Sequence, residues 1–263
     1  MSVLATVAAD LRDEQEALDA VVSGIPDQRW TTSTPSPRWT VRDQIGHLTY
    51  FDGTAALAVT DPQRFNESIS SLLAGDMDAE TLHRHLAPGD LLAAWRSNRF
   101  ALNDIASRLD GSERIPWYGP PMSATSFLTA RLMDTWTHGQ DVVDALGAER
   151  PVTDRLAHIV RLGFITRGWT YVNRREEQPL GDVRLELEAP SGTTWIHGPA
   201  EFSSVVRGPA LDFCLVVTQR RHLDDTALDV TGDAARDWLT KAQAFAGPPT
   251  DGPPPRNSDH SRG

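Results

Sequence analysis

Residues 131–139 read RLMDTWTHG, a helical pattern that carries two metal-ligating side chains. The carboxylate of Asp134 precedes the imidazole of His138 by four residues, so on a helix both lie on one face with Cβ atoms about 6 Å apart. His47 lies in a second strongly helical stretch, residues 40–48. If the two helices pack side by side, three ligands meet at one point and leave a tetrahedral metal ion one open position, as catalytic sites require.

The composition limits what the protein can bind. The chain has 263 residues, enough for two modest domains. Its formal net charge of -11 and pI near 5.1 argue against nucleic acid or an anionic membrane surface as partner. The single cysteine, Cys214, excludes an internal disulfide and a Cys-rich zinc cluster, which fits a reducing cytoplasm. Any bound metal must therefore have nitrogen and oxygen ligands.

Targeting signals are not evident in the sequence. The first ten residues lack a basic start and do not resemble a signal peptide. No apolar run approaches the roughly 20 residues that cross a bilayer. We therefore expect a cytoplasmic protein that acts on a small molecule, without membrane or nucleic-acid partners, as a monomer or homodimer.

Helical periodicity dominates the N-terminal half. Apolar residues recur at helical spacing over four stretches, which predict helices over residues 4–22, 40–59, 88–109 and 123–146. The second begins with Thr40 followed three residues later by Asp43, which resembles a capping box. Four long helices without an intervening strand predict a bundle over residues 1–150, and a bundle core is a usual place for metal ligands.

The second half has a different pattern. A helix is expected over residues 154–171, and beyond Pro179 a period of two predicts a hairpin over residues 183–187 and 193–196. Further elements are expected as a helix over 209–222, a strand over 227–231 and a helix over 234–245. The fold class is thus α+β, with a small α+β domain over residues 151–246. The Pro- and Gly-rich tail, residues 247–263, is predicted to be disordered.

Several motifs together resemble the DinB-like, mycothiol-dependent maleylpyruvate isomerase family. They are WTVRDQIGHL at residues 39–48, IPWYGPPMS at 115–123, the Asp134-to-Asp141 segment, and GPALDFCLVVTQRRH at 208–222. The resemblance covers nearly the whole chain apart from the tail. It implies an N-terminal four-helix bundle that holds a divalent metal, typically zinc, and a C-terminal domain similar to sterol-carrier proteins. It also implies a low-molecular-weight thiol such as mycothiol, which adds to an electrophilic small molecule.

The resemblance also implies site residues. The His, Glu and His ligands of such proteins correspond to His47, Asp134 and His138, and Arg220 is the counterpart of an arginine needed by the isomerase. Asp134 departs from the family pattern because it is one methylene shorter than Glu. It must draw the helix closer, bind through water, or hold the metal weakly.

Other residues have both a functional and an ordinary interpretation. Arg96 and Arg99 could grip a carboxylate of the substrate or the cofactor thiol, or they could be solvated. Asp141 could accept the second ring N–H of His138, or it could be a solvated acid. Asp43 is better explained as a helix cap than as a partner of His47.

The remaining candidates are a loop, a thiol and several histidines. Residues 117–121 form a rigid apolar loop that could roof a substrate pocket or simply pack. Cys214 lies in an apolar run and is expected to be buried and inert. His83 and His85 could bind metal adventitiously, and His158, His197 and His222 are expected to be structural.

Three functions are consistent with this pattern. The first is a metal-dependent isomerase or S-transferase that uses a thiol, with Arg220 and the arginines at 96 and 99 holding anionic groups. The second is a hydrolase in which the metal activates water and Asp134 or Asp141 is the base. The third is a non-catalytic module with a structural metal and an apolar ligand in the C-terminal domain. The family resemblance favours the first.

Overall fold

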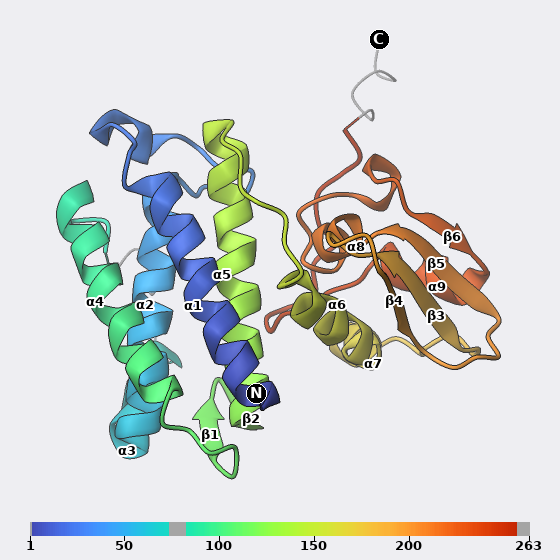
Figure 1. Cartoon of the computed structure of the whole chain (residues 1–263), viewed down its shortest axis with the longest axis horizontal. Helices are drawn as coiled ribbons and strands as arrows, with labels where there is room; N and C mark the ends of the chain where they lie inside the picture. Colours follow the sequence, from blue (N-terminus) through green and yellow to red (C-terminus); the bar gives the residue numbers. More distant parts are fainter. Residues whose placement is uncertain (1, 74–82, 257–263) are drawn as a thin grey trace. The chain divides into compact units, whose positions relative to one another are not determined.

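The computed structural model describes residues 2–73 and 83–256, and the chain divides into two compact units, Met1–Pro151 and Val152–Gly263 (Figure 1). Unit 1 is mainly helical, and unit 2 combines helices with a four-stranded sheet. The predicted α+β class is therefore confirmed. Among the described residues, no helix combines the length and apolarity needed to cross a bilayer.

Unit 1 contains four long helices that lie side by side (Figure 1). These four helices match the four that periodicity predicts, and their buried faces include Leu18, Ile45, Leu48, Trp95 and Val142. In chain order the elements of unit 1 are α1 (Val3–Val22), η1 (Asp27–Thr31), α2 (Val41–Thr60), α3 (Pro62–Leu73), α4 (Pro88–Ala106), β1 (Arg114–Trp117), β2 (Gly119–Ser123) and α5 (Ala124–Leu146).

Helix α2 begins at a capping box, as predicted. The Thr40 hydroxyl accepts from the backbone N–H of Asp43, and the Asp43 carboxylate accepts from the backbone N–H of Thr40 at 2.8 Å. Asp43 also pairs with Arg84 at 2.6 Å. The expected capping role of Asp43 is confirmed, and the cap sets where α2, with His47 in its second turn, leaves the preceding loop.

Helix α3, the hairpin β1–β2 and the short helix η1 of unit 1 were not predicted. Helix α3 starts immediately after α2, where Pro62 is well suited to a first helical position and Asp61 accepts the N–H of Arg64. The loop expected over residues 117–121 belongs instead to the antiparallel hairpin β1–β2. Trp117 in that hairpin stacks on Phe65 of α3, with ring centroids 5.7 Å apart, so aromatic packing holds both elements against the bundle.

Unit 2 is built around a mixed sheet with strand order β4-β3-β5-β6. The predicted hairpin is confirmed as the antiparallel pair β3–β4. The elements of unit 2 are α6 (Leu156–Ile165), α7 (Arg167–Arg174), β3 (Val183–Glu188), β4 (Thr194–His197), β5 (Ser204–Pro209), α8 (Ala210–Val217), η2 (Leu223–Asp225), β6 (Asp229–Thr231) and α9 (Asp233–Leu239).

Unit 2 departs from the sequence prediction at several places, and helix α9 ends at Leu239, well before the predicted residue 245. The helix expected over residues 154–171 is interrupted at Thr166, whose backbone leaves helical geometry. Strand β5 was missed because Val205 and Val206 are both buried, which removes the alternation used to find strands. Helix α8 stops at Val217, before the predicted end, because Gln219 adopts a left-handed conformation with φ 58°.

The described part of the expected tail makes hydrogen bonds within unit 2. The backbone N–H of Thr250 donates to Gln243, and that of Arg256 donates to Asp225. Arg174 forms a 2.8 Å ion pair with Asp251. Residues 257–263, the rest of the segment predicted to be disordered, lie outside the described residues.

The capping box gives a test of how α2 is held. Thr40→Val removes the hydroxyl that satisfies an N-terminal N–H, so we expect a loss of about 1 kcal/mol of unfolding free energy. The measurement is the urea midpoint of the far-UV helical signal. Thr60→Val, at the exposed end of α2, is the matched control and should change stability by less than about 0.5 kcal/mol. Equal losses in both variants would contradict the capping role.

Candidate metal centre

The structure brings His47, Asp134 and His138 together. Helix α2 supplies His47, and successive turns of α5 supply the other two side chains. Nε2 of His47 lies 3.3 Å from Oδ2 of Asp134, and Nε2 of His138 lies 3.4 Å from Oδ1 of the same carboxylate. One ligand atom from each residue lies within 4.8 Å of the others. The predicted convergence of the two helices on one point is therefore observed.

The spacing fits a tetrahedral divalent ion. Zinc binds imidazole nitrogen and carboxylate oxygen at about 2.0–2.2 Å, which places neighbouring ligand atoms about 3.3–3.5 Å apart on a tetrahedron. The two nitrogen-to-oxygen distances fall within that range. The shorter side chain of Asp134 thus contacts both imidazoles, one through each carboxylate oxygen. The donor set, two nitrogens and one oxygen, is one that zinc accepts.

The protonation states also suit metal binding. Burial, together with a smaller contribution from the nearby His138, lowers the pKa of His47 to about 4, so the His47 imidazole is neutral at pH 7. Burial acts to raise the pKa of Asp134, but His47, Arg131 and His138 lower it by more, and the result lies well below the ordinary value. A neutral imidazole and an ionised carboxylate are the forms that ligate a cation.

Gln44 fixes the ring orientation of His138. Its side-chain oxygen contacts Nδ1 of His138, and since an amide oxygen only accepts, Nδ1 carries the proton. The lone pair of Nε2 then faces Asp134. The amide nitrogen of Gln44 donates to Asp141 at 3.2 Å and to Thr34 at 2.9 Å, which sets the direction of the amide.

Asp141 therefore contacts His138 only through Gln44, whereas the sequence suggested a direct contact. It does not accept the ring N–H of His138 directly, because Gln44 occupies that place. Asp141 is fully buried and not solvated, and it also accepts a 2.8 Å hydrogen bond from Ser36. Sequence reasoning missed Gln44, although its position three residues before His47, on the same helix, was a usable signal.

Arg131 is a second residue that sequence reasoning left without a role. It is buried, and its guanidinium pairs with Asp134 at 2.8 Å and with Asp52 at 2.7 Å. Burial raises the pKa of Asp52, and the nearby Arg131 offsets part of that effect. The signal in the sequence was its place three residues before Asp134, on the same helix face.

Aromatic rings form the walls of the site. Trp39 stacks on His138, with centroids 5.5 Å apart and planes 17° apart, and its ring lies 5.3 Å from that of His47. Phe51 lies 4.4 Å from His47 on the following turn of α2. Trp39 and Phe51 are both half-buried. They enclose the imidazoles in an apolar setting that strengthens electrostatic interactions at the centre.

The predicted arginines have other partners in the structure. Arg96 and Arg99 of α4 both bind Asp19 of α1, and Arg99 also donates to the backbone oxygen of Gln15 at 2.7 Å. Arg220 belongs to unit 2 and donates to the backbone oxygen of Thr218 at 2.9 Å. The roles expected for these arginines toward cofactor and substrate stay predictions.

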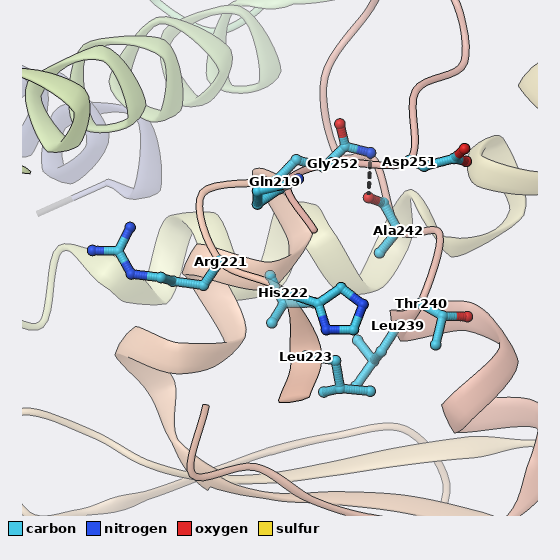
Figure 2. Close-up of a pocket in the computed structure, with 11 residues that line it drawn as sticks. Gln219, Arg221, His222, Leu223, Leu239, Thr240, Ala242, Asp251 and Gly252 are labelled. Carbon is cyan, nitrogen blue, oxygen red and sulfur yellow. Dashed lines mark hydrogen bonds between the residues drawn. The ribbon is translucent and has the colours of Figure 1, made fainter. Parts of the chain in front are cut away.

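Cys214 and the hollow beside Gln219 in unit 2 do not supply an alternative centre. Cys214 is buried, and burial raises the pKa of its thiol well above the ordinary value, which suits an inert residue. Figure 2 shows a hollow in unit 2 lined by residues that include Gln219, Arg221 and His222. Its volume is about 10 Å³, room for about one water molecule, so it is too small for an organic substrate.

Unit 1 is thus a helical bundle with a group of three residues that could hold a metal ion. The sequence profile of the mycothiol maleylpyruvate isomerase N-terminal domain matches residues 11–143, and the profile described as wyosine base formation matches residues 181–231. The first match spans half of the chain. The chain belongs to the mycothiol maleylpyruvate isomerase N-terminal domain family.

Two relatives and two solved structures extend the likeness over most of the chain. The uncharacterized proteins MT0041 and Rv0036c of Mycobacterium tuberculosis, from strains CDC 1551 / Oshkosh and ATCC 25618 / H37Rv, are each 44% identical over 245 residues, which covers 92% of this chain and 95% of theirs. Mycothiol-dependent maleylpyruvate isomerase and a histidine-to-alanine mutant of it superpose with TM-scores of 0.56 and 0.58 at 19% identity. Each superposition covers 87% of this chain and 92% of the other, so the fold is shared.

The Gln44 contact gives a test of how the ligand His138 is oriented. Gln44→Leu removes the acceptor for the Nδ1 proton, so the ring loses its fixed tautomer and direction. We expect the zinc dissociation constant to rise 10- to 100-fold, measured by competition with a chromophoric chelator.

Gln140→Leu serves as the control for that variant. Gln140 is a half-buried glutamine of the same bundle, and its side chain donates to Asp144 at 2.9 Å and not toward a candidate ligand. Its zinc affinity should equal that of the unaltered protein. An unchanged dissociation constant for Gln44→Leu would show that Gln44 does not orient His138.

Proposed function

We propose that this protein is a metal-dependent enzyme that uses a low-molecular-weight thiol to isomerise an electrophilic small molecule or to transfer sulfur to it. The observation that carries the proposal is the set of three ligand atoms from His47, Asp134 and His138, spaced for a tetrahedral ion and leaving one position for a further ligand. Bound zinc supplies Lewis acidity and lowers the pKa of a thiol at that position.

The chain's own residues prepare the centre for this chemistry. Gln44 directs the lone pair of His138, and Arg131 holds one oxygen of Asp134. Trp39 and Phe51 limit water around the imidazoles. A deprotonated thiol in such a setting is a strong nucleophile toward an unsaturated carbon.

The reaction type follows from what happens after the thiol adds. In an isomerase, addition to a carbon–carbon double bond leaves a single bond that rotates, and elimination returns the thiol and the isomer. In a transferase, the sulfur adduct is the product. The family membership and the solved structures make mycothiol and maleylpyruvate the first thiol and substrate to assay.

The composition supports the setting we propose for this activity. The net charge of -11 disfavours nucleic acid as partner, and the single buried cysteine suits the reducing cytoplasm in which a free thiol cofactor persists.

The metal content of the purified protein tests whether the proposed site binds a metal ion. We expect about one zinc per chain in the unaltered protein and a loss of most of it in His47→Ala, because two remaining ligands hold the ion weakly. The measurement is elemental analysis after dialysis against trace chelator. His85→Ala is the control and should keep its zinc. If the unaltered protein and His47→Ala both contain negligible zinc, the proposal is contradicted.

The thiol requirement separates this function from the two alternatives. With zinc bound, turnover of the substrate should depend on added thiol and should fall at least 100-fold in His47→Ala. Turnover without added thiol would identify a hydrolase. Metal binding without any turnover, together with a lower melting temperature for His47→Ala, would identify a structural metal.

A further inference from the structure

Arg131 lies between two carboxylates, the buried Asp52 and the partly exposed Asp134, of which only Asp134 belongs to the candidate metal centre. Its Nη1 atom donates to Asp134 at 2.8 Å, and its Nη2 atom donates to Asp52 of α2 at 2.7 Å. The Arg131 side chain is 3% exposed and that of Asp52 is fully buried. A buried guanidinium that bridges two helices in this way has little freedom to move.

Asp52 is itself held from two other helices. Its Oδ2 atom accepts from Nε2 of Gln15 in α1 at 3.2 Å and from the indole N–H of Trp95 in α4 at 3.1 Å. The carboxylate that anchors Arg131 is therefore fixed by α1, α2 and α4 together, and Arg131 transmits that fixed position to Asp134 on α5.

Aromatic rings flank the guanidinium. The rings of Phe51 and Trp117 lie 5.9 and 6.0 Å from the central carbon of Arg131. These contacts favour a cation at this place and shield it from water, so the ion pairs work in a medium of low polarity. Trp117, on the unpredicted hairpin β1–β2, is thereby connected to the metal centre.

We propose that Arg131, anchored by Asp52, is a positioning residue that aims the short carboxylate of Asp134 at the metal. The inference rests on the proposed metal centre. It adds the contact that lets an aspartate, although shorter than a glutamate, serve as a metal ligand there. Arg131 occupies one face of the carboxylate, and the bridge fixes the plane in which Oδ1 and Oδ2 meet the two imidazoles. The short side chain has only two side-chain torsions, so holding one oxygen sets the direction of the other.

The direction in which metal affinity changes when Arg131 is removed shows whether Arg131 acts through its charge or by orienting Asp134. By Coulomb's law alone, the positive Arg131 repels a divalent cation, so removing it should tighten metal binding. If Arg131 aims the ligand, removing it should weaken metal binding. The two possibilities therefore predict opposite changes.

The test is the double variant Asp52→Asn with Arg131→Met. Removing both Asp52 and Arg131 keeps the net charge and leaves no unpaired charge at the fully buried position 52, which would threaten the fold. We expect a folded protein whose zinc dissociation constant rises 10- to 100-fold, measured by chelator competition, while the metal-free protein keeps its circular dichroism spectrum. An unchanged or lower dissociation constant would overturn the inference.

Arg131→Lys is the second variant and does not depend on the double variant folding. Lysine keeps the charge opposite Asp52 but is a point donor that cannot make two fixed, planar contacts. We expect zinc binding about tenfold weaker than in the unaltered protein. Binding as tight as in the unaltered protein would show that the bridging geometry has no role.

A matched control tests whether losing any buried ion pair of unit 1 weakens zinc binding. Glu14 and Arg150 form such a pair at 2.9 Å in the same unit, with side chains only 3% and 5% exposed. The variant Glu14→Gln with Arg150→Met should lose thermal stability and keep its zinc affinity. Equal weakening in this control and in the Asp52 and Arg131 variant would overturn the inference.

Failure of the inference differs from failure of the proposed function. If the unaltered protein and His47→Ala bind zinc alike, the metal centre itself is wrong. If zinc binding depends on His47 but not on Arg131 and Asp52, the centre stands and only the positioning role falls.

Discussion

The partly buried carboxylate of Asp134 is the charge that the interior of unit 1 must balance. A charge removed from water costs several kcal/mol unless partners surround it. Asp134 lies between Arg131 and the imidazoles of His47 and His138. Two carboxylates, Asp52 and Asp134, face one guanidinium, which leaves one net negative charge among these three groups. A divalent cation converts this to one net positive charge, which favours an anionic further ligand such as a deprotonated thiol.

Periodicity and caps predicted the four long helices because each buries one continuous apolar face, and α2 starts at the predicted capping box. The missed elements depend on contacts distant in sequence. Strand β5 is recognised only by its parallel pairing with β3, and hairpin β1–β2 by the packing of Trp117 on Phe65. The break between α6 and α7 follows from the backbone of Thr166, which no local pattern marks. Local signals predict helices well, whereas long-range pairing decides short strands.

The candidate ligands were accessible from sequence because the spacing of Asp134 and His138 and the family resemblance both indicate them. The supporting residues were not. Gln44 and Arg131 lie on the same helix faces as the ligands, but a polar residue at such spacing is usually solvated. Only the fold shows that Gln15 and Trp95, from two other helices, hold Asp52, and that Asp52 in turn pairs with Arg131. The order of the supporting contacts, with Gln44 between His138 and Asp141, likewise needs coordinates.

The account depends on one cation held jointly by α2 and α5. A crystal of the zinc-loaded protein, measured above and below the zinc absorption edge, tests this directly. The account predicts one anomalous peak about 2.0–2.2 Å from Nε2 of His47, Nε2 of His138 and an oxygen of Asp134, with a fourth position occupied by a non-protein ligand. A fully occupied zinc peak elsewhere, with no density among these three side chains, would contradict it.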